Sequence, residues 1–274
     1  MSFSINSNTG SLQSNFSLNQ NQNNLNKTLS ALSSGDKLSS AATDAASLAI
    51  SEKLLAFVSG SGQAIQNAND SIGLYQVADG GLSGIEDNTQ RIRVLTLQAS
   101  NDTLSSDDRV SIQKEIDGLS ESSLDIANST SFNGINLLDG AGGSEGNGTF
   151  VTQTGANSGE TQSTTIGDIR PSIPTVNVTT QAGRDAALGN IDSGLVAISD
   201  TRATIASAQN SLISNIRNTS VGQINAASAV SQLRDVDFAL ESANFSRQNI
   251  LAQTGAFAQA QSNASKSNLV GLLG

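Results

Sequence analysis

The amino-acid sequence predicts a mainly α-helical protein, in which long antiparallel coiled-coil helices from both chain halves flank a small β-hairpin region. Apolar residues recur at spacings of three, four and seven in both halves, as in helices that pack along one face. The only prolines, Pro171 and Pro174, lie close together, so the rest of the chain can form long helices. Residues 139–183 instead combine Gly and Asn with short β-branched runs, which indicates hairpins.

The first helix is predicted within residues 6–32. Its apolar seam, meaning a row of apolar side chains along one helix face, comprises Leu18, Leu25, Leu29 and Leu32. The residues between them are mostly Asn, Gln and Ser, which include poor helix formers. We therefore expect this helix to need a packing partner.

The stretch 29–53 is predicted to link two packed layers. Gly35 is expected to end the first helix as a C-cap, and an Ala/Ser-rich segment then starts the next helix. Asp44 lies inside this restart, and Ala45 and Ala46 are small enough to let another backbone approach closely. These four residues are predicted to form the link between layers and a subunit-packing site.

The next helices fill the rest of the first half. A helical pattern runs from Ala41 to about Ala99, with room for a bend at residues 60–62. Asp107 and Asp108 suit the first turn of a further helix that ends near Ser129. Asn133-Gly134 then indicates a tight turn.

The second half begins with the β region and returns to helix. Within residues 139–183, three β-branched runs are predicted to build the hairpins: 149–153, 162–166 and 175–180. A long helix is predicted from near Asp185, with Arg202 and Gln209 as polar exceptions in its apolar seam. From Leu233, a helical pattern continues to Leu273.

Composition narrows the chemistry. The 274 residues carry a net charge of −10 and include no Cys and no His, which excludes thiol nucleophiles, histidine bases and common zinc sites. Asp235 and Asp237, without further carboxylates nearby, are poor metal ligands. We expect no enzyme activity, no metal and no cofactor. The acidic balance argues against nucleic acid or an anionic membrane as a partner.

Charge is also unevenly distributed along the chain. Residues 1–40 and residues 241–274 each sum to +1, so residues 41–240 carry −12. Nearly neutral ends with apolar seams are expected of segments that are buried against other chains. No apolar run approaches the roughly 20 residues that span a membrane, and the first residues do not resemble a cleavable signal.

Blocks in both halves carry a resemblance to a known family. They include LSSGDKLSSAATDAASLAISEKL, QRIRVLTLQASNDT, IANSTSFNGINLLDG, AISDTRATIASAQNSLISNIRN and RDVDFALESANFSRQNILAQTGAFAQAQSN. With these blocks in this order, the chain resembles bacterial flagellin, in a short form without large variable outer domains. The alternatives are a hook–filament junction protein and a secreted coiled-coil adhesin or immune ligand.

The resemblance implies a structural subunit that polymerises into the extracellular flagellar filament used for swimming. It implies an inner helical domain from residues 1–40 and 235–274, and an outer helical domain from residues 41–234. It further implies that the chain is secreted without signal cleavage. The implied partners are other copies of the chain, an export chaperone at the C-terminal end, and the hook-junction and cap proteins.

The resemblance also implies two kinds of surface site. Recognition by the innate receptor Toll-like receptor 5 would involve Arg91, Leu95 and Glu115, although Val94 replaces the Glu that is common in the family. O-linked sugars would be carried by exposed hydroxyl residues of the insert: Ser172, Thr175, Thr179 and Thr180.

Overall fold

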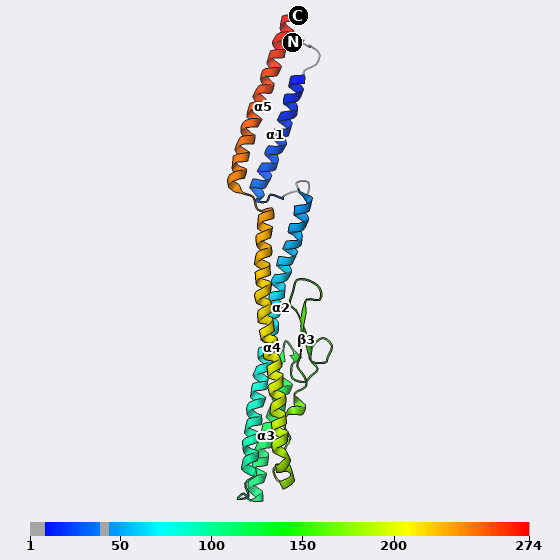
Figure 1. Ribbon diagram of the computed structural model, residues 1–274, viewed down its shortest axis with the longest axis vertical. Helices are drawn as coiled ribbons and strands as arrows, with labels where there is room; N and C mark the ends of the chain where they lie inside the picture. Colours follow the sequence, from blue (N-terminus) through cyan, green and yellow to red (C-terminus); the bar gives the residue numbers. More distant parts are fainter. Residues whose placement is uncertain (1–8, 39–43, 274) are drawn as a thin grey trace. The chain divides into compact units, whose positions relative to one another are not determined.

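The computed structural model describes residues 9–38 and 44–273, and its chain divides into two compact units. The first, which we call the terminal unit, comprises Met1–Ala56 and Asn225–Gly274. The second, the central unit, comprises Phe57–Ile224. Figure 1 shows the helices of both units, and the predicted mainly helical fold with small antiparallel hairpins is confirmed.

The terminal unit is built on two antiparallel helices, α1 (Thr9–Ser34) and α5 (Phe238–Leu273), which lie side by side (Figure 1). The predicted helix within residues 6–32 therefore has the partner that its polar composition required. Polar groups contribute to this contact: the Gln259 amide donates a hydrogen bond of 2.8 Å to the Ser11 hydroxyl. The unit also includes the start of α2 (Ala45–Ala99) and the end of α4 (Gln181–Arg234).

The central unit contains the main apolar core. Helix α3 (Ser106–Ser129) packs with α2 and α4, and two neighbouring clusters of buried side chains lie among them. The first cluster also includes residues of the hairpin region, and the second includes the C-terminal end of α2 and the N-terminal half of α3. Fully buried members are Tyr75, Leu82, Ile85, Ile92, Ile116, Leu138, Ile166, Ile191, Ile198 and Ile205.

Helix α4 has the apolar seam that its sequence predicted. Ile191, Ile198, Ile205 and Leu212 are all buried, at 1 % exposure or less. The polar exception Arg202 is accommodated because its guanidinium bonds Asp79 of α2 at 2.8 Å and also pairs with Glu86. These bonds raise the pKa of Arg202, with the Asp79 hydrogen bond as the largest cause.

Local sequence signals set several of the element boundaries. Ser105 and Asp108 form a capping box at the start of α3, in which Ser105 Oγ accepts from Asp108 N at 3.2 Å and Asp108 Oδ2 accepts from Ser105 N at 3.1 Å. The strands β1 (Ser131–Phe132) and β2 (Ile135–Asn136) are joined by Asn133-Gly134, whose φ angles of 51° and 77° form the expected tight turn.

A second hairpin packs on the helices mainly through polar contacts. Strand β3 (Thr149–Gln153) pairs antiparallel with β4 (Thr161–Thr165), with Val151 opposite Ser163. The Ser71 and Thr152 hydroxyls are 2.7 Å apart, and the Gln162 amide donates to the Ala208 carbonyl of α4 at 3.1 Å. Two of the three predicted β runs are thus strands.

The third run, 175–180, is not a strand. Two of its backbone groups bond one side chain of α3: Gln113 Oε1 accepts from Val178 N at 2.7 Å, and Gln113 Nε2 donates to the Val176 carbonyl at 2.9 Å. Val176 and Val178 are buried in the second cluster. This β-branched run is therefore an extended core segment, in which the Gln113 side chain makes hydrogen bonds that a neighbouring strand would otherwise make.

The bend allowed at residues 60–62 is also absent, because α2 is continuous from Ala45 to Ala99. Two of its glycines, Gly60 and Gly62, instead lie close to neighbouring residues. A Cβ at Gly60 would lie 3.1 Å from the Ala156 Cβ in the hairpin loop, and one at Gly62 would lie 3.2 Å from Gln223 Nε2. Close approach, rather than flexibility, accounts for glycine at these two positions.

The helix predicted to run on from Leu233 is interrupted. Helix α4 ends at Arg234 and α5 begins at Phe238. The prediction that Asp235 and Asp237 lie within a helix is therefore wrong. Asp237 Oδ1 accepts from the amides of Ala239 and Leu240, both at 3.0 Å, and so caps α5. Helix α4 also starts earlier than predicted, at Gln181.

Two further predictions concern the domain boundary and membrane-spanning segments. The predicted domain boundary between residues 40 and 41 lies outside them, and the two-domain division stays a prediction. Within residues 9–38 and 44–273, no helix has a stretch both long and apolar enough to cross a bilayer.

Candidate functional site

Two short segments that connect helices pair with each other in the terminal unit. Residues 35–38 follow α1, and residues 235–237 join α4 to α5; we call these segments the crossings. Val236 N donates to the Gly35 carbonyl at 3.1 Å, and Lys37 N donates to the Arg234 carbonyl at 2.7 Å. Asp36 and Asp235 thereby form an isolated antiparallel bridge. The predicted link is thus bonded to a segment almost 200 residues away in sequence.

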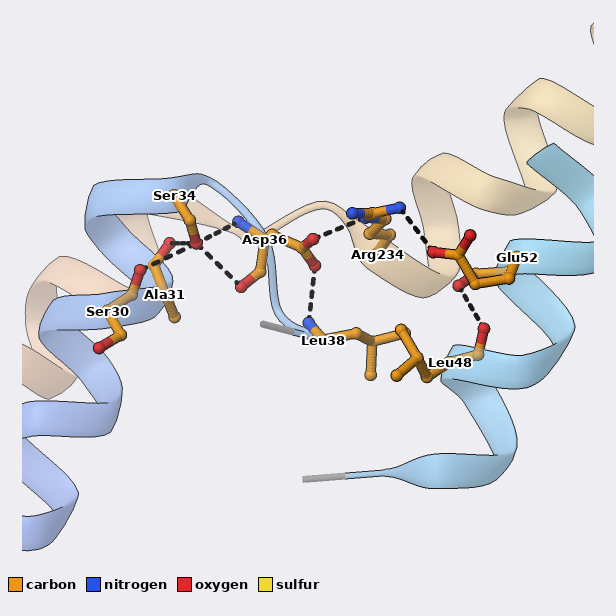
Figure 2. Close-up of polar contacts among 9 residues, drawn as sticks. Ser30, Ala31, Ser34, Asp36, Leu38, Leu48, Glu52 and Arg234 are labelled. Carbon is orange, nitrogen blue, oxygen red and sulfur yellow. Dashed lines mark hydrogen bonds and ion pairs between the residues drawn. The ribbon is translucent and has the colours of Figure 1, made fainter. Parts of the chain in front are cut away.

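Arg234, the last residue of α4, ties these segments together through its side chain (Figure 2). Its Nε donates to Asp36 Oδ2 at 2.6 Å, and its Nη1 lies 3.4 Å from Glu52 Oε1 of α2. The Asp36 side chain is only 16 % exposed, whereas Glu52 is 61 % exposed, so the Asp36 pair is the better shielded of the two. The Asp36 hydrogen bond is the largest cause of a raised Arg234 pKa.

Asp36 also shapes its own crossing. Its Oδ1 accepts from Leu38 N at 2.8 Å, and its backbone N donates to the Ser34 hydroxyl at 3.2 Å, as Figure 2 shows. Leu38 is buried at 4 % exposure. Gly35 has a φ of +70° and donates to the Ala31 carbonyl at 2.9 Å. Its predicted role in ending α1 agrees with this left-handed conformation, which L side chains rarely adopt.

Asp44 is the N-cap of α2. Its Oδ1 accepts from Ala46 N at 3.1 Å and from Ser47 N at 3.0 Å, and the Ser47 hydroxyl donates to Oδ2 at 2.6 Å. These bonds, led by the Ser47 side chain, lower the pKa of Asp44. Ala45 and Ala46 are exposed within the single chain, so both remain available to another copy.

The residues predicted for receptor recognition lie at the α2–α3 contact of the central unit. Arg91 and Glu115 form an ion pair with Nη2 and Oε1 2.7 Å apart, and their side chains are 54 % and 47 % exposed. Leu95 is instead buried at 2 % exposure among the second cluster. Val94 and Leu97, on the same stretch of α2, are the exposed apolar residues there, at 54 % and 49 %.

The hydroxyl residues predicted to carry sugars differ in accessibility. Thr175, Thr179 and Thr180 are exposed, whereas Ser172, in the short 3-10 helix η1 (Arg170–Ser172), is half-buried. The Thr179 hydroxyl donates to Asn177 Oδ1 at 2.6 Å, and Thr180 Oγ1 accepts from Gly183 N at 3.2 Å. At least two of these hydroxyls therefore already serve local turns.

Sequence reasoning missed Arg234 and Glu52 as members of the link. A single Arg gives no signal of its own, and its partner Asp36 is 198 residues away. The sequence did contain a signal for the break between α4 and α5: Asp237 directly precedes Phe238, and Asp is a common helix N-cap residue. In residues 9–38 and 44–273, no cluster of three or more acidic side chains could hold a metal ion.

The described residues form long helices with apolar side chains exposed at their surface, an arrangement typical of a structural subunit. The N-terminal helical region of bacterial flagellin matches residues 5–142, and the C-terminal helical region of bacterial flagellin matches residues 188–273. The chain belongs to the bacterial flagellin family, whose members form the flagellar filament. The hook-junction and adhesin alternatives are not favoured.

Individual relatives agree over almost the whole chain. The flagellin of Halalkalibacterium halodurans is 34 % identical over 98 % of this chain and 99 % of its own length. The flagellin of Bacillus subtilis is 34 % identical with the same coverage. The crystal structure of Bacillus cereus flagellin, 28 % identical, aligns with a TM-score of 0.51 over 56 % of this chain and 88 % of its own.

Proposed function

We propose that neighbouring copies in the filament bury the apolar faces of α1 and α5. The observation that carries this proposal is the exposure of large apolar side chains on both helices. On α1 these are Leu12 and Phe16, at 68 % and 64 %; on α5 they include Ile250 and Phe257, at 64 % and 74 %. Large apolar side chains gathered in this way mark an interface, since their burial contributes roughly 1.5 to 3 kcal/mol each.

The test is polymerisation of purified chain, followed by electron microscopy and sedimentation. Phe257→Ser should raise the critical concentration for filament growth by at least about tenfold, because it removes more than 1.4 kcal/mol of burial. Ala256→Ser, at a neighbouring exposed position of α5, is the matched control and should polymerise normally. Unchanged polymerisation of Phe257→Ser would contradict the proposal.

The link carries the second part of the proposal. We propose that Gly35, Asp44, Ala45 and Ala46 lie where copies pack closely, since both alanines are exposed and small. Ala45→Leu or Ala46→Leu should then change filament waveform or lower filament thermal stability. Filaments with the parent waveform and melting behaviour would rule this out.

Export and its chaperone form a third part. The chain would leave the cell without signal cleavage, and a chaperone would bind residues 231–274 before export. Support comes from the apolar side chains that α5 exposes in the single chain, including Leu240 and Leu251 at 60 % and 42 %. A pull-down from the bacterial cytosol, with the intact chain and a chain ending at residue 230, would test it. Equal chaperone recovery by both would contradict it.

Recognition by Toll-like receptor 5 is proposed for the Arg91–Glu115 ion pair, with Leu95 holding the two helices in register. Both charged side chains are about half exposed. Arg91→Ala should reduce receptor signalling by monomers in a reporter assay. Arg93→Ala is a matched control, since Arg93 also forms an exposed ion pair, with Asp192 at 2.9 Å. Equal loss for both variants would show a general charge effect instead.

The remaining predicted partners are the hook-junction and cap proteins, which would contact the first and last subunits of a filament. O-linked sugars on Ser172, Thr175, Thr179 and Thr180 remain a prediction for a glycosylating host. Intact-mass spectrometry of native filaments would detect them, and a mass equal to that of the sequence would exclude them.

A further inference from the structure

We propose that Asn133 is a modification site, at which the side-chain amide is lost through cyclisation onto the backbone nitrogen of Gly134. This proposal concerns chemical ageing of the chain and does not depend on filament assembly. The chain contains two Asn-Gly pairs, Asn133-Gly134 and Asn147-Gly148. Asn-Gly is the dipeptide in which this cyclisation is least hindered, because glycine has no side chain beside the attacking nitrogen. The two pairs differ in their surroundings.

The reaction needs only water and hydroxide. Hydroxide removes the proton of Gly134 N, and this nitrogen then attacks Asn133 Cγ. A cyclic imide forms as the bond from Cγ to the side-chain nitrogen breaks, and ammonia leaves with a proton taken from water. Water then opens the ring: attack at the former side-chain carbonyl gives aspartate, and attack at the former backbone carbonyl gives isoaspartate. In sum, an amide and water become a carboxylate and ammonium.

Both reacting groups of the Asn133-Gly134 pair are unengaged. The two residues are exposed and form the turn between β1 and β2. Among residues 9–38 and 44–273, neither the Asn133 side chain nor Gly134 N has a hydrogen-bond partner. A Cβ at Gly134 would meet no atom within 4 Å, so water and hydroxide reach this nitrogen freely. No hydrogen bond has to break before the nitrogen can attack.

The Asn147-Gly148 pair has the same two residues in opposite surroundings. Gly148 is buried, and its N donates to the Gly142 carbonyl at 2.8 Å. The Asn147 side chain is bonded at both atoms: Oδ1 accepts from Thr149 N at 3.0 Å, and Nδ2 donates to Glu145 Oε2 at 3.0 Å. These bonds occupy the nucleophile and fix the side chain that it would attack. Asn147 should therefore keep its amide in the folded chain.

The turn at Asn133 can rearrange while its base stays in place. Asn133 has a φ of 51°, a left-handed conformation that costs an L residue free energy, so leaving it relieves strain. The turn is closed by a short hairpin, with Phe132 opposite Ile135. Leu137 and Leu138, which follow, are buried at 1 % and 0 % exposure and anchor the hairpin. The product therefore changes one surface turn, which gains a negative charge and, as isoaspartate, one extra backbone carbon.

The test is peptide mapping by mass spectrometry of the folded, full-length chain during incubation in mildly alkaline buffer. Cleavage after glutamate places the two sites on different peptides, because Glu145 lies between them. The amide of Asn133 should be lost at least about tenfold faster than that of Asn147, because the second pair must first break its hydrogen bonds. Methylation by an isoaspartyl methyltransferase should detect isoaspartate in the Asn133 peptide. Equal rates, or faster loss at Asn147, would overturn the proposal.

Two controls separate the structural cause from the local sequence and from direct hydrolysis. In denaturant the bonds around Asn147 are lost, so the two rates should become similar. A rate difference as large in denaturant as in the folded chain would mean that neighbouring sequence selects Asn133, which would overturn the structural argument. Asn133→Gln places the amide one carbon further from Gly134 N, so this variant should keep its amide. Loss at the parent rate in Asn133→Gln would show direct hydrolysis and contradict the cyclisation.

Discussion

The helices of the two units differ in how much of their apolar surface is buried within the chain. In the central unit, Ile198, Ile205 and Leu212 of α4 are at most 1 % exposed. In the terminal unit, Phe16 of α1 and Phe257 of α5 are 64 % and 74 % exposed. The central unit therefore buries this apolar row within the chain, whereas the terminal unit leaves large apolar side chains exposed, which is where we propose that neighbouring copies pack.

The largest expected effect is a difference in monomer stability between substitutions in the two units. Leu212→Ala should destabilise the monomer by about 2 to 5 kcal/mol, because it removes a fully buried side chain and leaves a cavity. Phe257→Ala should change monomer stability by less than about 1 kcal/mol, since little of that side chain is buried. Urea unfolding followed by circular dichroism measures both. Equal losses would mean that the terminal unit also depends on this seam.

A smaller effect is expected at the polar position of the central seam. Arg202→Ala leaves the Asp79 and Glu86 carboxylates without their shared partner. We expect the free energy of unfolding to fall by about 1 to 2 kcal/mol. This is less than for a fully buried ion pair, because the arginine side chain is 34 % exposed. Arg202→Lys, which keeps the charge but loses the planar fork, should recover part of it. Unfolding by urea again gives the value, and no change in Arg202→Ala would show that the pair contributes nothing.

In the terminal unit, Arg234→Ala should act locally. We expect the loss of stability to be concentrated at the crossings, because the Asp36 carboxylate that loses its partner is partly shielded from water. Amide hydrogen exchange should speed up at Leu38, whose N–H bonds the Asp36 carboxylate. Exchange at Ile205 in the central unit serves as the internal control. A uniform increase at both sites would indicate global destabilisation instead.

The smallest effect is a pH dependence that both units share. Asp44 caps α2 in the terminal unit and Asp108 caps α3 in the central unit, and hydrogen bonds lower both pKa values from 3.8. Because the pKa of Asp108 is lower in the folded state, its carboxylate stabilises the fold fully above pH 3.8. This stabilisation is lost as the pH falls through the pKa of the folded state. Asp108→Asn should flatten the fall in melting temperature below pH 4 slightly. An unchanged slope would show that the cap does not titrate in this range.

Periodicity in the sequence predicted the helices and the α4 seam well, because burial along one helix face requires regular spacing. It also predicted the α1 seam, in which Leu18, Leu25 and Leu32 are half-buried, but it could not show that Leu12 and Phe16 stay exposed in one chain. Spacing reports an amphipathic face, and the partner that covers it belongs to the tertiary or quaternary structure.

Two of the errors have a common origin in side chains that replace backbone partners. Residues 175–180 have strand-forming composition, but the Gln113 amide takes the place of a neighbouring strand. The α4–α5 break was missed because Asp237 caps a helix from a position that also suits a helix interior. The Arg234–Asp36 contact was invisible for a different reason, since it joins residues 198 positions apart.

The bonded crossings have a consequence for engineering chimeric flagellins. Gly35 with Val236, and Lys37 with Arg234, exchange one backbone bond each, so the register of one crossing fixes that of the other. Inserting or deleting one residue in either segment would shift the Asp36–Asp235 pairing. The two crossings therefore form a single replaceable cassette, and a chimera should take both from the same parent.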